Sequence, residues 1–273
     1  MAVQYSVSPE GARYPLPGKE DYEKEFERLK AMVTSRRKKG DEVVVVMGLG
    51  FVGAVMAAVV ADSRDRKSGK PKKFVIGMQR PSARSYWKIP RLNEGVAPVK
   101  AEDPEVDIII RRAVLEEKNL VATYTYDALR LADVVVVDVQ CDFVKSELGN
   151  CTTGSAAIGA LEESMRIIGE KIEPSCLVLI ETTVPPGTTE YIAYPIIKKA
   201  FSRRGISREP LIAHSYERVM PGRDYVRSIR DFWRVCSGID GESTKRVVKF
   251  LSEVLNVQKY PLTVLERPIE SET

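Results

Sequence analysis

Three glycines near position 50 have a spacing that suits phosphate binding. Gly48, Gly50 and Gly53 form the pattern G-x-G-x-x-G within VVVVMGLGFVGAVMAAVVA, residues 43–61. In such a loop the first glycine allows a tight turn, the second lets the backbone approach a pyrophosphate, and the third lets the helix pack close to the strand. The run changes from β-branched residues to alanines, which predicts strand, turn and helix, with free N–H groups facing the phosphates. The sequence therefore predicts a dinucleotide site, and a purely structural turn is the alternative.

The residues after the next strand bear on which dinucleotide binds. An acid about 20 residues past the glycines normally hydrogen-bonds the ribose 2′-hydroxyl of NAD. Here the strand FVIGM, residues 74–78, is followed by Gln79 and Arg80. Gln79 can still bond a hydroxyl, whereas Arg80 could meet the 2′-phosphate of NADP, stay in solvent or stack on the adenine. We therefore expect NAD as the cofactor, with NADP as the open alternative.

Composition limits the other classes of function. The 273 residues carry a net charge of +4 with charges of both signs mixed along the chain, which suits an anionic small ligand and does not indicate nucleic acid. No metal site is expected, because His214 is the single histidine and the cysteines lack CxxC pairing; they are Cys141, Cys151, Cys176 and Cys236. Apart from the glycine-broken run 43–61, no apolar stretch reaches membrane-spanning length, and no signal-peptide core is present. We expect a cytoplasmic protein.

Strands and helices alternate after residue 41. The strands expected at 42–48, 72–78, 132–139 and 175–183 are continuous apolar runs, each followed by a helix; the helices are 52–62, 103–119, 154–172 and 187–204. Further strands at 209–215 and 232–239 precede a last helix at 241–255. Strands that are apolar on both faces are typical of a parallel sheet covered by helices. We predict an α/β fold of Rossmann type: a doubly wound, mostly parallel sheet with helices on both faces.

The first 40 residues differ in character from the rest. Residues 1–18 are expected to be a flexible arm, and a highly charged helix follows up to Gly40. Its apolar positions recur at helical spacing and are Tyr22, Phe26, Leu29 and Met32. We expect this helix to pack on the outside of the next domain. Residues 1–40 thus form an arm with a helix, and residues 41–273 form the dinucleotide-binding domain.

Five ordered blocks resemble the UDP-glucose/GDP-mannose dehydrogenase family of nucleotide-sugar dehydrogenases. They are MGLGFVG, LNEGVAPVKAEDPEVDIIIRRAV, ADVVVVDVQCDF, IETTVPPGTTE and AHSYERVMPGRD, starting at residues 47, 92, 132, 180 and 213. The last block resembles the branch that oxidises UDP-N-acetylmannosamine. The resemblance implies NAD-dependent oxidation of a UDP-sugar of the N-acetylhexosamine type at C6 to the uronate. Two successive hydride transfers would reduce two NAD molecules.

The resemblance implies roles for the residues at matching positions. The cofactor-binding positions are Gly48, Gly50, Phe51, Val52, Gly53, Gln79, Arg80, Gln140, Cys141 and Thr183. The substrate-binding positions are Glu217, Arg218 and Val219, and Glu217 is the candidate catalytic residue. QCDF, residues 140–143, stands where the family has PTPF, so Cys141 replaces a threonine expected near the nicotinamide.

Considered by itself, the TTVPPG stretch also has a purely structural explanation. Pro185 and Pro186 fix the backbone φ angle and Gly187 frees it, so the three residues could simply end a strand in a rigid turn. Thr188 or Thr189 would then cap the following helix. The stretch alone therefore does not decide between a turn and a cofactor contact.

Three further candidates have structural alternatives. Glu217 could form an ion pair with an arginine instead of meeting a substrate. Cys141 is more simply a small buried residue at a strand end than a nucleophile, because no base lies beside it in the sequence. His214 is expected to be a structural neighbour of the site rather than a general base.

The catalytic half of the family has no counterpart in the sequence. In the family, a segment resembling IESET, residues 269–273, opens a long helix carrying a lysine and an asparagine, and the domain with the catalytic cysteine follows. We therefore expect the cofactor-binding half of an enzyme, working as a homodimer or beside a partner chain that carries the C-terminal half. The alternatives are a non-catalytic dinucleotide-binding or regulatory module, a subunit of a split dehydrogenase, and a single-step dehydrogenase of the 6-phosphogluconate or 3-hydroxyacid type.

Overall fold

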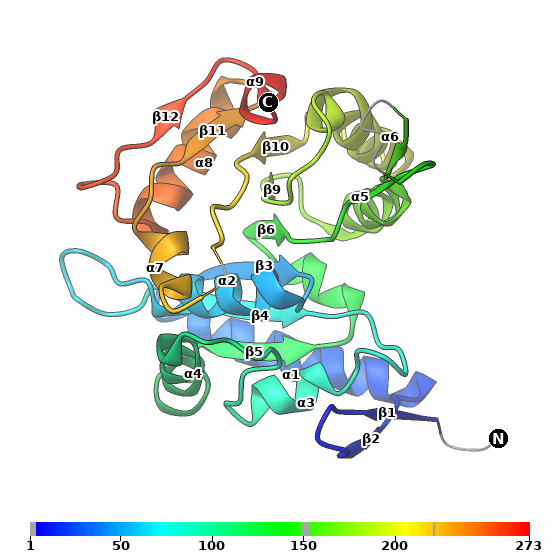
Figure 1. Ribbon diagram of the computed structural model, residues 1–273, viewed down its shortest axis with the longest axis vertical. Coiled ribbons are helices and arrows are strands. Elements are labelled where there is room, and N and C mark those ends of the chain that lie inside the picture. Colours follow the sequence, from blue (N-terminus) through cyan, green and yellow to red (C-terminus); the bar gives the residue numbers. More distant parts are fainter. Residues whose placement is uncertain (1–3, 149–152, 221) are drawn as a thin grey trace.

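An eight-stranded sheet runs through the computed structural model, which describes residues 4–148, 153–220 and 222–273. The strands lie in the order β12-β11-β10-β9-β6-β3-β4-β5 (Figure 1). Neighbouring strands are parallel except for β10 and β11. The bounds are β3 Glu42–Met47, β4 Lys73–Met78, β5 Leu120–Thr123, β6 Val134–Val137, β9 Leu177–Ile180, β10 Leu211–His214, β11 Val235–Gly238 and β12 Thr263–Val264.

The strand order is that of a dinucleotide-binding fold. From β5 to β10 the chain order is third, second, first, fourth, fifth, sixth, which is the Rossmann arrangement. The order reverses between β3 and β6, so this pair forms the topological switch point where such folds bind ligands. The predicted doubly wound, mostly parallel α/β sheet is confirmed.

Helices cover both faces of the sheet and create two apolar cores. Side chains alternate along a strand, so Val44 and Val46 of β3 join one core and Val43 and Val45 join the other. The first core is closed by α2 Phe51–Asp62, α4 Pro104–Arg111, α7 Tyr225–Arg230 and α8 Gly241–Val254. The second is closed by α1 Lys19–Arg37, the 3-10 helix η2 Tyr126–Leu131, α5 Gly159–Lys171 and α6 Tyr194–Arg203. Shorter helices are α3 Lys88–Asn93, η1 Arg112–Glu116, η3 Thr189–Ala193 and α9 Pro268–Ser271.

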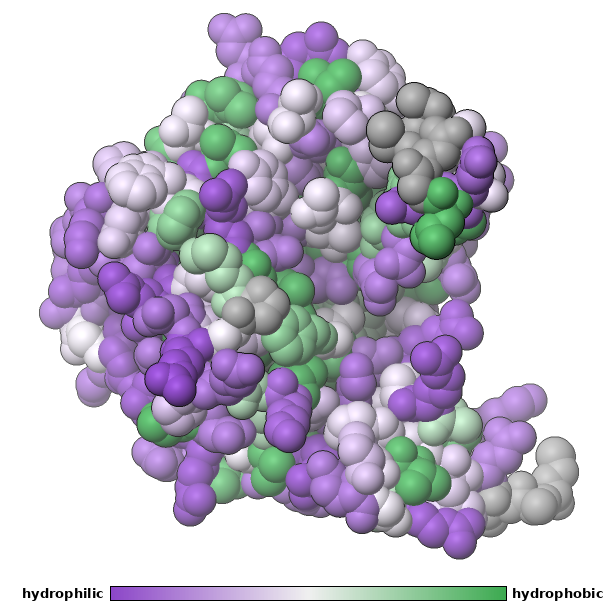
Figure 2. All heavy atoms as spheres, in the orientation of Figure 1, coloured by the Kyte–Doolittle hydropathy of each residue, from purple (hydrophilic) through white to green (hydrophobic). Residues whose placement is uncertain are grey.

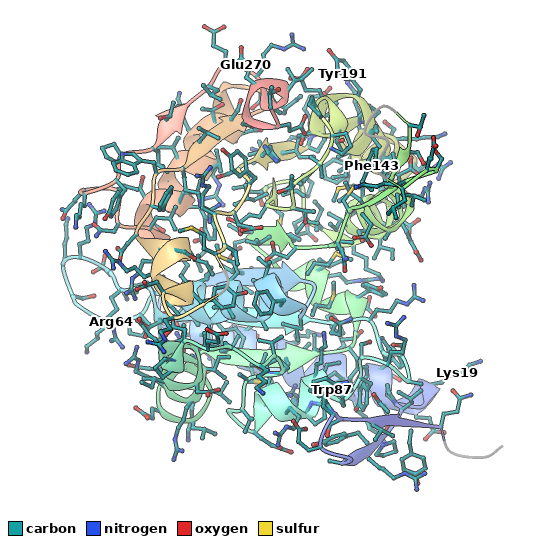
Figure 3. All side chains as sticks on the ribbon, in the orientation of Figure 1. Lys19, Arg64, Trp87, Phe143, Tyr191 and Glu270 are labelled. Carbon is teal, nitrogen blue, oxygen red and sulfur yellow. The ribbon has the colours of Figure 1, made fainter. Side chains whose placement is uncertain are left out.

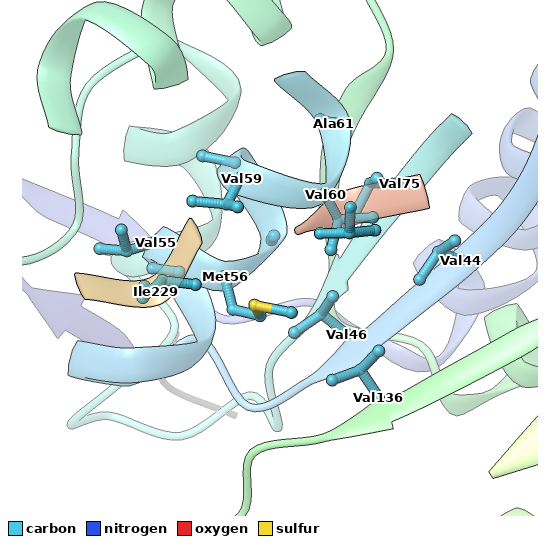
Figure 4. Packing of buried hydrophobic residues seen from close by; sticks show 14 of the residues in the cluster. Val44, Val46, Val55, Met56, Val59, Val60, Ala61, Val75, Val136 and Ile229 are labelled. Atoms are coloured by element: carbon cyan, nitrogen blue, oxygen red, sulfur yellow. The ribbon is translucent and has the colours of Figure 1, made fainter. Parts of the chain in front are cut away.

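Helix α2 is buried along most of its length because it is apolar on all sides. Every residue from Gly53 to Ala61 is buried. In Figure 4, Met56 points toward Val46 and Val136, and Val55 lies beside Ile229 of α7. A helix without a polar face has to be enclosed by other elements. The glycine loop is thus attached to the most firmly packed helix of the domain.

The N-terminal segment is more ordered than the sequence predicts. Residues expected to be a flexible arm form a hairpin of β1 Tyr5–Val7 and β2 Arg13–Pro15, so that expectation was wrong. The Ser6 hydroxyl donates to the Ala83 carbonyl and accepts from the Trp87 amide, and Figure 3 places Trp87 beside this hairpin. A tertiary contact orders the segment. Helix α1 packs on the domain through Leu29 and Val33, as predicted.

Two other segments differ from their predictions. Strand β5 falls in the short stretch LVAT, for which no strand is predicted. The helix expected at 154–172 begins only at Gly159, because residues 155–157 form β8, which pairs antiparallel with β7 Asp142–Val144. Both strands are short, and each is defined by its pairing with another strand, β5 with β4 and β8 with β7. Within the described residues, none of the helices is long and apolar enough to cross a membrane.

Candidate functional site

The three glycines of the loop have three different steric environments. Gly48 has φ of +110°, and a β-carbon there would lie 2.5 Å from the Asp138 carbonyl oxygen. A β-carbon on Gly53 would lie 1.8 Å from the Gly48 carbonyl oxygen, so the first turn of α2 sits directly on the loop. Gly50 has no atom within 4 Å of the place its β-carbon would take. The first and third glycines are required by the fold, and the second leaves room for a ligand to approach the backbone.

A cavity of about 300 Å³ lies at the carboxyl ends of β3, β4 and β6. It is at the switch point of the sheet and next to the start of α2, where free N–H groups favour a phosphate. In Figure 2 the surface is hollowed on the right, between the β7–β8 hairpin above and the segment after β4 below. The lining residues are Met47, Gly48, Gly50, Met78, Gln79, Arg80, Lys88, Tyr126, Asp138, Val139, Gln140, Ala160, Glu163, Ser164 and Ile167.

The predicted cofactor residues divide into three groups. Those that line the cavity are Gly48, Gly50, Gln79, Arg80 and Gln140. Those in the first turn of α2 are Phe51, Val52 and Gly53. The remaining two, Cys141 and Thr183, follow β6 and β9 without lining it. The glycine loop and the end of β4 therefore come together as predicted, whereas Cys141 and Thr183 lie outside this cavity.

Gln79 is bound to the glycine loop itself. Its Oε1 accepts a hydrogen bond of 2.9 Å from the Leu49 amide, and its Nε2 lies 3.5 Å from the Arg80 carbonyl oxygen. The carboxamide oxygen therefore holds the loop in place from the neighbouring strand. This leaves its amide protons, rather than its oxygen, for a ribose hydroxyl.

Helix α7 anchors the start of α2 on the opposite side of the loop. The Phe51 ring stacks on the Tyr225 ring, with centroids 4.8 Å apart, and the Tyr225 hydroxyl donates to the Phe51 carbonyl. Burial, with the nearby Glu217 and Asp138 carboxylates, raises the pKa of Tyr225. The phenol therefore remains a neutral hydrogen-bond donor at physiological pH.

A buried cluster of charged groups lies beneath the ends of β6, β9 and β11. Arg234 and Glu181 are both fully buried, and Nη1 of Arg234 lies 3.3 Å from Oε1 of Glu181. The same nitrogen donates to the Ser215 and Tyr216 carbonyls. The Asp138 carboxylate is also buried, and neither of its oxygens has a hydrogen-bond partner.

Three carboxyl groups share this single arginine. Burial, with the charges of Glu181 and Glu217, raises the pKa of Asp138 well above its usual range. Burial also raises the pKa of Glu181 to about 7, although Arg234 opposes the shift. A carboxyl group in such a position tends to hold a proton, because one cation cannot compensate three anions in a medium of low polarity. The cluster is therefore expected to retain a proton, and it lies directly beneath the glycine loop.

Glu217 and Arg218 follow β10 and have different partners. The Glu217 amide donates to the Glu181 carbonyl, and its carboxylate accepts from the Val219 amide. The Arg218 guanidinium lies 4.9 Å from the centroid of the Phe232 ring and donates to the Tyr216 hydroxyl. In the part of the chain that the structure describes, Glu217 has no ion-pair partner, so the predicted alternative of a Glu217–arginine pair is wrong. Glu217 remains half-buried beside the acid cluster.

The TTVPPG turn is capped from the C-terminal segment. The Glu272 carboxylate accepts hydrogen bonds from the Gly187 amide and, at 2.8 Å, from the Thr189 amide. The hydroxyl of Thr188 instead donates to the Pro185 carbonyl. The expectation that a threonine caps this helix was therefore wrong, because a carboxylate 83 residues away along the chain fills that role.

His214 is fully buried at the end of β10. Its Nδ1 lies 2.8 Å from the Ser271 hydroxyl, and burial lowers its pKa to about 4. The imidazole is therefore neutral at physiological pH, which favours the structural role over that of a general base.

Cys141 is half-buried after β6. Burial raises the pKa of its thiol, and the Asp142 carboxylate adds to the shift. Because the thiolate is the nucleophile, the thiol is expected to react slowly at neutral pH.

Iodoacetamide should alkylate Cys141 a few-fold more slowly at pH 7 than it alkylates a free thiol of pKa about 8.5. Peptide mass spectrometry measures the rate, and the fully buried Cys176 is the unlabelled control. Rapid labelling that levels off below pH 8 contradicts this expectation.

Several residues that line the cavity at the carboxyl ends are not predicted from the sequence. The α5 residues Glu163, Ser164 and Ile167 reach the cavity only because that helix packs beside the switch point. Lys88 is the first residue of α3. Asp138 carries a detectable signal, since it is the polar residue that directly follows the buried strand VVVV, residues 134–137. Charged residues at the carboxyl ends of parallel strands are candidates for a site by position alone.

A second cavity of about 570 Å³ lies at the opposite, amino end of β3 and β4. The loop after α2 and the end of α8 line it, and Arg64 lies on that side of the molecule, away from the hollow (Figure 3). Its positive charge is partly neutralised: Lys73 lies 2.6 Å from both Glu42 and Glu253. The residues that line it include no glycine loop and no helix N-terminus, so the cavity at the carboxyl ends is the better candidate for the dinucleotide.

Comparison with known proteins decides the family. Residues 42–255 match the NAD-binding domain of the UDP-glucose/GDP-mannose dehydrogenase family. The chain belongs to this family. The sequence-based resemblance is thereby confirmed, NAD is supported as the cofactor, and the 6-phosphogluconate or 3-hydroxyacid alternative loses its support.

Several relatives are dehydrogenases of N-acetylated sugar nucleotides. The chain is 27% identical over 206 residues to UDP-N-acetyl-D-mannosamine dehydrogenase of Pyrococcus horikoshii, covering 76% of this chain and 43% of that protein. It is 26% identical over 215 residues to UDP-N-acetyl-D-glucosamine 6-dehydrogenase of Pseudomonas aeruginosa, covering 79% and 44%. The crystal structure of NDP-N-acetyl-D-galactosaminuronic acid dehydrogenase from Methanosarcina mazei Go1 superposes with a TM-score of 0.72 at 30% identity, covering 90% of this chain and 47% of that one. The chain thus spans less than half the length of these relatives.

Proposed function

We propose that this chain supplies the NAD-binding half of a cytoplasmic dehydrogenase that oxidises C6 of a UDP-sugar of the N-acetylhexosamine type to the carboxylate. The observation that carries the proposal is the glycine loop, open at Gly50 and placed at the switch point of the sheet, in a chain of this family. The named relatives support the sugar class. NAD, when bound, accepts the hydride that leaves C6.

The residues of this chain would bind and orient the two reactants. The glycine loop and the start of α2 would hold the pyrophosphate, while Gln79 and Arg80 would face the adenosine ribose. Gln140, Cys141 and Thr183 follow β6 and β9, where they would border the nicotinamide. Glu217, with Arg218 and Val219, would stand on the substrate side.

Glu217 is the proposed catalytic residue of this half. Oxidation of the C6 alcohol releases a hydride from carbon and a proton from oxygen, so a base must take the proton. Glu217 is half-buried and has no ion-pair partner among the described residues, so its carboxylate can accept one. Oxidation to the acid takes two hydrides, and the intervening covalent step needs a reactive thiol. Burial raises the thiol pKa of Cys141, Cys176 and Cys236, so we assign that thiol to the part of the relatives' length that this chain does not span.

The test is NADH formation, followed by absorbance, with UDP-N-acetylmannosamine, UDP-N-acetylglucosamine and UDP-glucose as substrates. This chain alone is expected to bind NAD without turnover, and addition of a C-terminal half from a relative is expected to produce NADH with an N-acetylated sugar. Glu217→Gln in the reconstituted enzyme should lower kcat by about 100-fold or more, the usual contribution of a general base. NAD binding without turnover under every condition favours the alternative, a non-catalytic dinucleotide-binding module.

A further inference from the structure

The end of β4 has the electrostatic character of a phosphate site. In dinucleotide-binding folds an acid at this position bonds the ribose hydroxyls of NAD and repels a 2′-phosphate, whereas an arginine accommodates that phosphate. Here the strand is followed by Gln79 and Arg80. Neither residue is an acid, and the Gln79 oxygen is held by the Leu49 amide, so the carboxylate that repels a 2′-phosphate in NAD-specific folds does not occupy this position.

A cavity of about 640 Å³ continues the nucleotide cleft past the end of β4. It shares Gln79, Arg80 and Lys88 with the cleft. Its complete lining is Gln79, Arg80, Ser82, Ala83, Arg84, Ser85 and Lys88. Three cations and two hydroxyls are thus brought together without a carboxylate, a set of donors that suits a phosphate monoester.

Local hydrogen bonds hold this segment in a fixed turn. The Ser82 and Ser85 hydroxyls are 2.8 Å apart, and the Ser85 hydroxyl donates to the Arg80 carbonyl at 2.9 Å. The amides of Ser85 and Tyr86 both donate to the Ser82 carbonyl. The β1–β2 hairpin supports the turn from outside through the bond between Ser6 and Ala83. The cations therefore project from a turn whose backbone is already ordered.

The cations of this turn are available to a ligand. In the described part of the chain, Arg84 and Lys88 take part in no ion pair, and Arg80 has only a distant one, 3.9 Å from Glu163. Lys88 is half-buried, and burial lowers its pKa, so an anion beside it would relieve an unfavourable charge. By contrast, Lys73 of the cavity at the amino end is already paired with Glu42 and Glu253.

We propose that Arg80, Arg84, Lys88 and the Ser82–Ser85 turn form a subsite for a phosphate on the adenosine ribose, so that the domain accepts NADP as well as NAD. The inference rests on the proposed function, because it requires the cofactor to lie in the glycine cleft. It adds a ligand group that the family's NAD-binding description does not include.

Calorimetric titration tests the subsite with defined ligands. 2′,5′-ADP is expected to bind more tightly than 5′-AMP by about tenfold, the effect of one or two charge-assisted hydrogen bonds. The variant Arg84→Ala, which leaves the lining of the nucleotide cleft intact, should remove most of this advantage and leave the NAD affinity within about twofold. Lys67→Ala, which removes one exposed charge at the opposite end of the sheet, is the control and should preserve the advantage.

The outcomes separate the subsite from the proposed function. Equal or weaker binding of 2′,5′-ADP, with normal NAD binding, overturns the subsite and leaves the proposed function standing. Equal loss of NAD and 2′,5′-ADP affinity in Arg84→Ala also overturns it, since Arg84 would then serve the cleft in general. Failure of NAD, NADP and both fragments to bind overturns the proposed function itself.

Discussion

Replacing Gly53 with alanine should both destabilise the domain and remove NAD binding. The new β-carbon would lie 1.8 Å from the Gly48 carbonyl oxygen and 3.1 Å from the Asp138 β-carbon. Neither neighbour can yield easily, because Gly48 is itself pressed against the Asp138 carbonyl. Overpacking of this kind costs about 1–3 kcal/mol. We expect the free energy of unfolding to fall by that amount and the NAD affinity to fall by more than tenfold, as measured by urea denaturation and calorimetry.

Gly50→Ala is the matched control for that experiment. Gly50 has a φ of −77°, and no atom lies within 4 Å of the added carbon.

Alanine adopts this φ without strain, so the free energy of unfolding should stay within about 0.5 kcal/mol of the parent value. The NAD affinity should still fall, because the methyl group occupies the space through which the pyrophosphate approaches the backbone. Unchanged NAD affinity in Gly50→Ala, or normal folding and binding in Gly53→Ala, contradicts the assignment of the loop.

Replacing Arg234 with methionine should cost about 3–5 kcal/mol of unfolding free energy, the usual effect of removing one partner of a buried ion pair. Arg234 is fully buried and is the only cation among the described residues that contacts Glu181. It also donates to the Ser215 and Tyr216 carbonyls, which would lose their donor. Denaturant unfolding measures the loss. A change below about 1 kcal/mol contradicts the structural role given to the pair.

The same cluster predicts how stability depends on pH. Burial raises the pKa of Glu181 to about 7 in the folded protein, whereas an unfolded glutamate titrates near about 4.3. Between these values the folded state holds a proton that the unfolded state has lost, so stability falls as the pH rises from about 4.5 to 7. The raised pKa of Asp138 acts in the same direction. Glu181→Gln should reduce this slope, and an unchanged slope contradicts the assignment of Glu181.

Much of the fold could be predicted because its signals are local. The glycine spacing, the continuous valine strands and the apolar α2 each lie within one short segment, and the structure assembles them as expected. Strand β5 was missed because LVAT is too short to stand out and is defined by its pairing with β4.

The site was less predictable because its parts come from distant segments. Glu181 and Arg234 are 53 residues apart, and the Glu272 cap lies 83 residues from Thr189. No periodicity or motif links such residues before the sheet brings its strand ends together. Gln79 illustrates the same point. The sequence predicts that Gln79 follows β4, but its hydrogen bond from the Leu49 amide depends on how the glycine loop is folded.

A structure of the protein with NAD bound tests the central claim most directly. The account predicts that the pyrophosphate lies within hydrogen-bond distance of the backbone N–H groups at the start of α2, next to Gly50, and that the adenosine ribose lies beside Gln79 and Arg80. A dinucleotide bound elsewhere, for example in the basic cavity near Arg64 at the amino end of the sheet, would contradict it.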